Sequence, residues 1–413
     1  MLQKVSLGTS KIEKYRSVIS RETIVELQKL SQQLKGLRLC HVNSTPFGGG
    51  VAELLVSAIP IERELEVKAD WQIIRGDRRF FTITKSLHNA LQGNEYPLIN
   101  NPSTQKIYLG NNKTNARELD LNYDVFIVND PQPLPMRHYC RKNGAKWIWR
   151  CHIDSSEPDE ETWRYLRPYI EEYDAAVFTT EGFVPPDLNI PHIAIMAPAI
   201  DPLSSKNMLL SKGLCRSLLD NYGIDRHRPL IVQVSRFDPW KDPFGMIAAY
   251  RLAKEKIPRL QLALVGSFAN DDPEAWDLYA AVQEEANKDD DIHVLSNLTG
   301  VGNMEVNAFQ RASDVVVQKS TKEGFGLVVA EALWKETPVV AGNAGGISLQ
   351  MAGRLSHYLI NNVEDCAERI VRLLEYPDLA AELGREGKKH IQANFLMPRL
   401  IRDELSLVKK IAG

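Results

Sequence analysis

The chain has 413 residues, which at ordinary domain sizes makes two or three domains and excludes a single small module. Hydrophobic residues make up 44% of it and charged residues 25%, as in a folded globular protein. The 50 Lys and Arg residues against 53 Asp and Glu leave a net charge of −3, without the basic excess that a nucleic-acid-binding protein needs.

Membrane and disulfide-rich proteins are also disfavoured. No stretch approaches the roughly 20 apolar residues of a membrane span, and residues 1–30 contain no signal-like apolar run. The five cysteines are scattered, with no C-x-x-C pair and no zinc-ligand spacing. We therefore expect a cytoplasmic protein with reduced thiols, and neither a membrane nor a nucleic acid among its partners.

Strand-like and helix-like segments alternate along the first half of the chain. Ser20 precedes a helical pattern in which Ile24 and Leu27 share one face. An apolar run at 37–43 leads through three glycines into a second helical pattern. Further strands are predicted at 71–75, 123–129, 146–151, 175–179 and 193–196. Strands separated by helices predict a parallel sheet that is covered on both faces.

The same alternation resumes after a proline-containing polar connection at 197–213. Strands are predicted at 230–234, 261–265, 292–295, 315–318 and 338–341, helices at 244–256 and 275–287, and a helical tail from residue 363. We expect an α/β protein with two Rossmann-like, doubly wound domains, at 1–197 and 198–395. A last helix at 396–413 would pack back on the first domain. Ligand sites of such sheets lie at the carboxyl ends of their strands, here on the two sides of a cleft.

The most informative segment is EGFGLVVAEAL at 323–333, in which Gly324 and Gly326 follow a predicted strand and precede a helix. Such a loop directs the unused N–H groups of the helix towards an anion, as phosphate sites do. Glu323 and Glu331 are suited to accept hydrogen bonds from sugar or ribose hydroxyls. A helix N-terminus with a favourable acid in its first turn explains the pattern equally well without a ligand.

A second charged loop, VSRFDPWKDP at 234–243, also follows a predicted strand. Arg236 and Lys241 could neutralise the charge that builds on a departing diphosphate. Taken alone, a solvated charged loop is the better interpretation. The diphosphate role gains support because a doubly wound domain places this loop and the Glu323 loop at the same sheet edge.

Three strand ends of the first domain carry glycine or polar residues. The glycines at 48–50 could bring the backbone close to a phosphate or sugar, although they lack the G-x-G-x-x-G spacing of an NAD site. The other two ends offer hydroxyl-binding groups, with His152 and Asp154 expected to be exposed. A lone histidine after a strand is more often packed or solvated than catalytic. The histidines are not at metal-ligand spacing, so we expect no metal site.

These segments together resemble the retaining glycosyltransferases of family four, which have the GT-B fold. The resemblance depends on the spacing of Glu323 and Glu331, on Gly345 and Gly346 after a predicted strand, and on the Arg236 and Lys241 pair. Five longer segments resemble the trehalose glycosyltransferring synthases within that family: FGGGVAELL, NDPQPLP, WRCHIDSS, VSRFDPWKDP and VNAFQRASDVVVQKSTKEGFGL. They run from about residue 36 to 346, most of the chain.

The resemblance implies a role for each candidate residue. The catalytic set would be Glu323 on the donor glucose hydroxyls, Arg236 and Lys241 on the diphosphate, and His152 near the reacting carbon. The donor would also contact Gly48, Gly49, Gly50, Gly324, Phe325, Gly326, Leu327 and Val328, with Glu331 on the ribose. The acceptor would contact Asn129, Asp130, Gln132, Arg150 and Asp154.

The implied reaction joins the glucose of a nucleotide-diphosphate glucose, with UDP-glucose and ADP-glucose as candidates, to free glucose. The product is trehalose, with retention at the donor carbon. Relatives need no metal for catalysis, although Mg²⁺ could stimulate the reaction, and we expect a homodimer. Front-face transfer fits best, in which the leaving phosphate oxygen takes the acceptor's proton.

Two features leave alternatives open. The chain departs from the family after Ile347, because relatives have an acidic-glycine turn where this sequence has Met351 to Tyr358, which puts a hairpin expected there in doubt. The same architecture also serves other acceptors, trehalose phosphorylases and nucleotide-sugar 2-epimerases. A catalytically silent binding protein is disfavoured because the charged set is intact.

Overall fold

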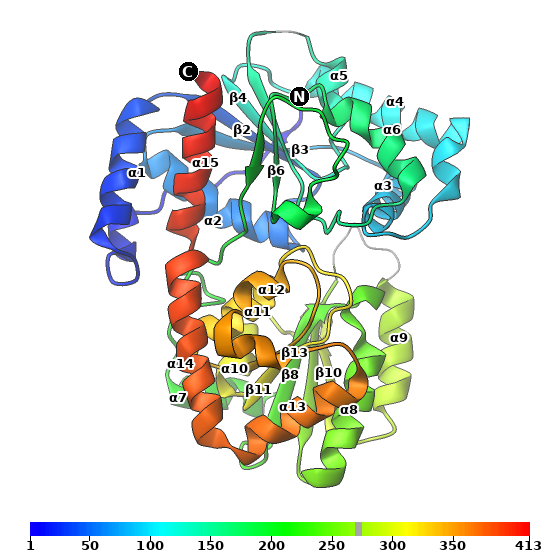
Figure 1. Cartoon of the computed structure of the whole chain (residues 1–413), viewed down its shortest axis with the longest axis vertical. Coiled ribbons are helices and arrows are strands. Elements are labelled where there is room, and N and C mark those ends of the chain that lie inside the picture. Colours follow the sequence, from blue (N-terminus) through cyan, green and yellow to red (C-terminus); the bar gives the residue numbers. More distant parts are fainter. Residues whose placement is uncertain (142, 269–274) are drawn as a thin grey trace. The chain divides into compact units, whose positions relative to one another are not determined.

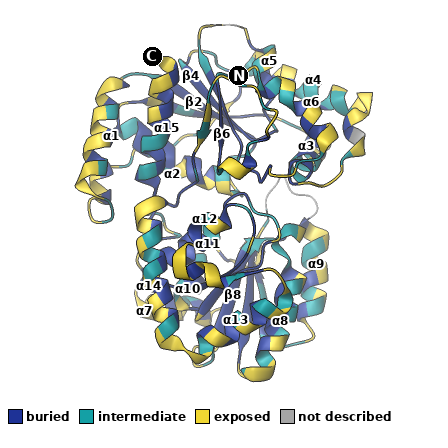
Figure 2. Ribbon diagram, in the orientation of Figure 1, coloured by how far each residue is buried: buried dark blue, intermediate teal, exposed yellow. Residues whose placement is uncertain are grey.

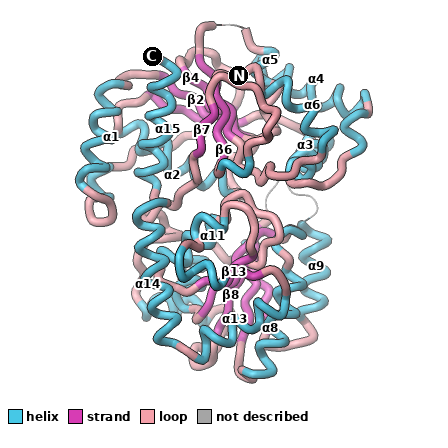
Figure 3. The backbone as a smooth tube through the Cα atoms, in the orientation of Figure 1, coloured by secondary structure: helices cyan, strands magenta, loops and turns pink. Residues whose placement is uncertain are grey.

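The computed structural model describes residues 1–141, 143–268 and 275–413. The chain divides into two compact units. Unit 1 contains residues 1–199 together with the last helix, which begins at Met397, and unit 2 contains the described residues between 200 and 396. Each unit is an α/β layer structure, with its strands (magenta in Figure 3) between helices.

Unit 1 contains a seven-stranded sheet in the order β1-β3-β2-β4-β5-β6-β7. Its strands are β1 (Gln3–Lys4), β2 (Arg38–Asn43), β3 (Lys68–Ile73), β4 (Val125–Asn129), β5 (Lys146–Arg150), β6 (Ala175–Phe178) and β7 (Ile193–Ile195). Its helices are α1 (Arg21–Gln33), α2 (Gly50–Glu64), α3 (Arg78–Leu91), α4 (Pro102–Glu118), α5 (Met136–Tyr139), α6 (Glu160–Ile170) and α15 (Met397–Ala412). The six predicted strands are confirmed, and they pair in parallel.

Unit 2 contains a six-stranded parallel sheet in the order β10-β9-β8-β11-β12-β13. Its strands are β8 (Leu230–Arg236), β9 (Gln261–Ser267), β10 (Ile292–Ser296), β11 (Val315–Gln318), β12 (Val339–Gly342) and β13 (Leu359–Ile360). Its helices are α7 (Lys212–Asp220), α8 (Pro243–Lys256), α9 (Ala275–Ala286), α10 (Asn303–Ala312), α11 (Leu327–Trp334), α12 (Ile347–Gln350), α13 (Val363–Glu375) and α14 (Pro377–Asn394). The segment that departs from the family, Met351 to Tyr358, contains the 3₁₀ helix Gly353–Tyr358, which leads directly into β13.

The apolar character of the strands explains why both sheets lie between layers of helices. Most residues of the central strands are buried, as the dark blue strands of Figure 2 show, because each sheet is covered on both faces, whereas the edge strands β1 and β7 have no buried residue. In unit 1 the core is strongly aromatic, and Phe126 stacks on Trp147 with 4.2 Å between ring centroids. All five cysteines are buried and free, as predicted. Within the described ranges, no helix combines the length and the apolar character that a membrane span requires.

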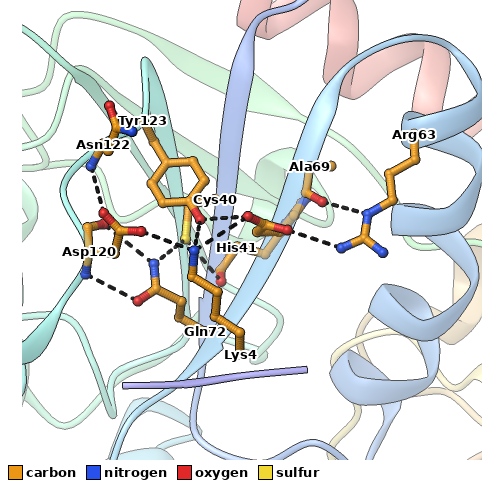
Figure 4. A network of polar contacts seen from close by, with 10 residues as sticks. Lys4, Cys40, His41, Arg63, Ala69, Gln72, Asp120, Asn122 and Tyr123 are labelled. Carbon is orange, nitrogen blue, oxygen red and sulfur yellow. Dashed lines mark hydrogen bonds and ion pairs between the residues drawn. The ribbon is translucent and has the colours of Figure 1, made fainter. Parts of the chain in front are cut away.

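The sequence did not predict β1, which pairs antiparallel with the edge strand β3. Its Lys4 explains the pairing (Figure 4). The Lys4 ammonium donates to Tyr123 Oη at 2.8 Å and to Asp120 Oδ2 at 2.9 Å, and Tyr123 in turn donates to Asp70 on β3 at 2.6 Å. Two residues are too short to show a strand periodicity, so the strand depends on its pairing with β3 and on these distant partners of Lys4.

A buried charge cluster fastens α15 to the sheet of unit 1. Figure 1 shows α15 beside α1 and α2. Glu404 of α15 accepts a hydrogen bond from Arg150 of β5 at 2.8 Å, and the His41 ring on β2 lies 3.1 Å from Glu62 of α2 and 3.8 Å from Glu404. Burial alone would lower the pKa of His41, but the charge and hydrogen bond of Glu62 together with the charge of Glu404 outweigh it and raise that pKa.

This cluster has the geometry of a metal site but not its charge balance. Ligand atoms of His41, Glu62 and Glu404 lie within 4.8 Å of one another. The cation that meets the Glu404 carboxylate is the guanidinium of Arg150, however, and the His41 ring lies against Glu62. A protein cation therefore already neutralises Glu404, and we assign the cluster to attachment of the helix.

Glu404→Ala should destabilise unit 1 strongly, because it leaves the buried Arg150 without its carboxylate. Loss of one partner of a buried pair costs about 3–5 kcal/mol. Urea denaturation and proteolytic release of the last helix measure the effect. Glu26→Ala is the matched control. Glu26 of α1 pairs at the surface with Arg402, which like Glu404 belongs to α15, so its loss should change the stability little. Equal effects of the two substitutions would contradict the assignment.

Candidate functional site

In unit 2 the predicted site residues gather where the strand order of the sheet reverses. β8 and β11 are parallel neighbours although the strands β9 and β10 and the helices α8, α9 and α10 lie between them in the chain. Helices therefore leave this pair in opposite directions and open a crevice at the carboxyl ends of the two strands, the usual ligand position in such sheets. Arg236 ends β8, and the loop that contains Glu323 follows β11.

Lys241 and Glu323 meet at this edge although they are 82 residues apart in sequence. The Lys241 ammonium donates to Glu323 Oε2 at 2.6 Å, and Ser320 Oγ donates to the same oxygen at 3.2 Å. Both side chains are mostly covered, with 17% and 14% of their surface exposed. Glu323 is therefore a paired carboxylate whose remaining lone pairs can accept hydrogen bonds.

Gln233 links the two loops beneath this pair. Its buried amide donates to Lys241 O at 3.0 Å and accepts from Lys319 N at 3.2 Å. Asp242 has a positive φ of 45° and caps α8 by accepting from Gly245 N at 3.0 Å. These contacts fix the backbone at Lys241 and therefore the position from which its side chain extends towards Glu323. Arg236 is more exposed, at 29% of its side chain, and its Nη2 lies 4.0 Å from Asp238.

Close backbone contacts explain the glycines of the second loop. Gly326 adopts a positive φ of 81° directly before α11. A Cβ on Gly346 would lie 2.4 Å from Gly324 O, so the loop and the segment after β12 pack backbone against backbone. Leu327 and Val328 thus begin the first turn of α11, where N–H groups lack helical acceptors.

Glu331, the predicted ribose contact, is almost fully buried. Its side chain is 2% exposed, its Oε2 accepts from Gln310 at 3.1 Å, and its Oε1 lies 3.2 Å from the Lys206 ammonium. Lys206 was missed by the sequence reasoning because it lies in the polar connection before the second series of strands. No strand end or glycine turn marks it.

In unit 1 the strand order reverses between β2 and β4. Gly48, with a φ of 82°, and Gly49, the N-cap of α2, form the turn after β2. Asn129 ends β4 and donates through Nδ2 to Val42 O at 3.1 Å, which orients its Oδ1 towards His152 Nε2 at 2.9 Å. His152 therefore donates from Nε2. Burial first, and the charge of Arg150 second, hold the pKa of His152 well below its usual value, so Nδ1 is an acceptor at neutral pH.

The other predicted acceptor residues lie around the same strand ends, with different surroundings. Asp154 was expected to be exposed but is buried. Its Oδ1 accepts hydrogen bonds from the backbone N and the hydroxyl of Ser156. Arg150 is buried, and its guanidinium binds Glu404. Gln132 Oε1 is buried and accepts no hydrogen bond within the described residues. Asp130 Oδ1 accepts from His152 N at 2.8 Å.

Asp130→Asn should stabilise the protein at pH 8 but not at pH 4. Burial raises the pKa of Asp130 to about 7, so below that pH the folded state keeps a proton that the unfolded chain loses near its usual pKa of 3.8. The stability that this proton contributes is complete below about pH 4 and is lost as the pH rises through 7. Asparagine keeps the acceptor oxygen and tolerates the φ of 62°. The thermal midpoint of the variant minus that of the wild type should rise with pH, and a constant difference would contradict this.

Gly346→Ala should destabilise unit 2 by about 1–3 kcal/mol, because its Cβ would meet the backbone of the Glu323 loop at 2.4 Å. Gly213→Ala is the control, since a Cβ there meets no atom within 4 Å and lies in helix α7. It should be neutral or slightly stabilising. Chemical denaturation of both variants gives the comparison, and equal stabilities would refute the close packing.

Two family models match the chain, "Trehalose synthase, N-terminal domain" at residues 41–185 and "Glycosyl transferases group 1" at 217–390. It is 47% identical to a trehalose synthase of Rubrobacter xylanophilus over the whole of both chains, and 46% identical to one of Thermococcus litoralis over 96% of each. A trehalose phosphorylase of Grifola frondosa is 27% identical over 92% of this chain and 58% of its own.

Solved structures agree on the fold. The trehalose 6-phosphate synthase of Burkholderia multivorans superposes with a TM-score of 0.71 at 17% identity, covering 92% of this chain and all of that one. A sucrose-phosphate synthase from Thermosynechococcus elongatus gives 0.70 at 17%, covering 91% and 98%. With near-full coverage by relatives at 46–47% identity, the chain belongs to the trehalose synthase family of glycosyltransferases, and its two units have the GT-B fold.

Proposed function

We propose that this glycosyltransferase moves glucose from a nucleotide-diphosphate glucose to free glucose and forms trehalose with retention. The observation that carries the proposal is the contact between Lys241 and Glu323 at the carboxyl edge of the unit 2 sheet. Arg236, the last residue of β8, lies at the same edge. One carboxylate for hydroxyls, two cations for a diphosphate and a helix N-terminus are what binding such a donor requires.

Charge stabilisation would come from unit 2. As the bond between the sugar carbon and the phosphate oxygen breaks, negative charge develops on the diphosphate. Arg236, Lys241 and the first N–H groups of α11 would stabilise that charge, each by about 2–4 kcal/mol. Glu323 is held by Lys241 and Ser320, so we assign it to the donor hydroxyls rather than to nucleophilic attack.

Unit 1 would supply the acceptor side. A neutral His152, fixed by Asn129, offers an acceptor nitrogen to a sugar hydroxyl. Gln132 Oε1, which accepts no hydrogen bond from the described residues, offers a second acceptor atom. The acceptor hydroxyl oxygen would form the new bond to the donor carbon on the face that the phosphate leaves, and its proton would pass to the departing phosphate oxygen. The products are trehalose and a nucleoside diphosphate.

Product analysis by NMR with ¹³C-labelled glucose tests the proposal. UDP-glucose or ADP-glucose with glucose should give α,α-trehalose. Trehalose from glucose 1-phosphate and glucose, with none from the nucleotide sugars, would instead indicate a phosphorylase, the activity named for the relatives at 27–29% identity. A new sugar from the donor alone would indicate an epimerase.

Arg236→Ala and Lys241→Ala should each lower turnover about a hundredfold, because each removes a charge directed at the leaving group. Steady-state rates at saturating donor and glucose measure this. Lys288→Ala is the control, since Lys288 forms an exposed pair with Glu285 on the same unit. Turnover that matches this control in both variants would refute the diphosphate role.

A further inference from the structure

Unit 2 contains an elaborately anchored turn, residues 201–208, that the proposed reaction does not yet use. Two side chains of α10 bind its backbone carbonyls. Asn307 Nδ2 donates to Ser205 O at 3.0 Å and to Met208 O at 2.8 Å. Arg311 Nη2 donates to Asn207 O at 3.1 Å and to Met208 O at 3.0 Å. The conformation of the turn is therefore determined by groups other than the side chain of Lys206.

The same turn is also attached to α11. The ammonium of Lys335 donates to Asn207 Oδ1 at 2.7 Å and to Glu331 O at 3.0 Å. Asn207 Nδ2 in turn donates to Asp201 O at 3.0 Å. As a result, the Lys206 ammonium lies 3.2 Å from Glu331 Oε1. Two helices and an internal hydrogen bond thus place one lysine against one buried carboxylate.

The electrostatics keep that carboxylate charged and able to accept more hydrogen bonds. Burial would raise the pKa of Glu331, but the charges of Lys206 and Lys335, with hydrogen bonds from Gln310 and Lys206, together outweigh it and hold the pKa below its usual value. Burial lowers the pKa of Lys335 itself to about 7. A carboxylate has about four lone-pair positions, and Gln310 and Lys206 account for two of them.

Exposure determines which member of the pair a ligand meets first. The side chain of Lys206 is 14% exposed and that of Glu331 only 2%. We propose that Lys206 is a donor-binding residue that fixes the Glu331 carboxylate and, together with it, recognises the hydroxyls of the donor's ribose. A ribose diol both donates and accepts hydrogen bonds, so a carboxylate beside an ammonium matches it. This inference rests on the proposed nucleotide-diphosphate donor.

The test compares nucleoside diphosphates that differ by one ribose hydroxyl. Calorimetry would measure the affinities of UDP and ADP and of their 2′-deoxy and 3′-deoxy forms for the full chain. Wild-type protein should prefer the ribonucleotide over at least one deoxy form about tenfold. In Lys206→Met that preference should fall towards one, and the affinity for the ribonucleotide should drop about tenfold. Lys206→Arg, which keeps the charge, should recover part of both.

The controls separate this role from a purely structural one. Lys206→Met leaves the Asn307, Arg311 and Lys335 contacts in place, so the protein should fold, but with a lowered thermal midpoint because the buried Glu331 loses one of its cations. The ribose preference, measured well below that midpoint, and its partial recovery in Lys206→Arg are readouts that a loss of stability alone does not change. Lys288→Met controls for loss of a surface lysine. In turnover, Lys206→Met should raise the donor KM with kcat little changed.

Each other outcome overturns a defined statement. If wild-type protein binds the diphosphates and Lys206→Met keeps the wild-type preference for ribose, the role of Lys206 is wrong and the donor proposal stands. If wild-type protein binds the diphosphates without any ribose preference, ribose recognition by the pair is wrong. If wild-type protein binds no nucleoside diphosphate, the donor proposal fails, and the role of Lys206 fails with it.

Discussion

Parallel pairing of β8 with β11 is the constraint on which the candidate site of unit 2 depends. Parallel strands carry all their carboxyl ends at one edge, so the loops that follow them must meet there whatever their separation in sequence. Pairing of Val315 with Ile231 and of Val316 with Val232 brings the two loops together. Gln233 then joins them from below, and Lys241 reaches Glu323. Without this register, the cation and the carboxylate would belong to two unrelated surface loops.

Glycines are required in this unit because the loops pack backbone to backbone. A Cβ on Gly342 would lie 1.9 Å from Ser320 O, directly before the Glu323 loop. Side chains at such positions would push the loop away from the sheet and Glu323 away from Lys241. The placement of Lys241 and Glu323 therefore depends on glycine positions that have no functional side chain of their own.

Both units also bury charge, and in each the buried charge fastens a segment distant in sequence. In unit 1 the cluster of His41, Glu62, Arg150 and Glu404 holds α15. In unit 2, Lys335 of α11 binds Asn207 of the turn at 201–208, and Lys206 of the same turn meets the buried Glu331. Burial of ions is costly and favours stability weakly at best. Its advantage is geometric, because an ion that must be paired accepts few alternative positions, and this suits the placement of a binding residue.

The sequence alone determined the order of the elements, the parallel α/β character of both units and the loops that hold Arg236, Lys241 and Glu323. These properties are local, since periodicity, glycine turns and strand ends depend on residues that are neighbours in the sequence. Tertiary structure alone decided β1, the burial of Asp154, the binding of Arg150 to Glu404 and the meeting of Lys206 with Glu331. Each of these depends on partners far along the chain. A lysine in a polar connection looks like any solvated lysine until the fold brings a buried carboxylate to it.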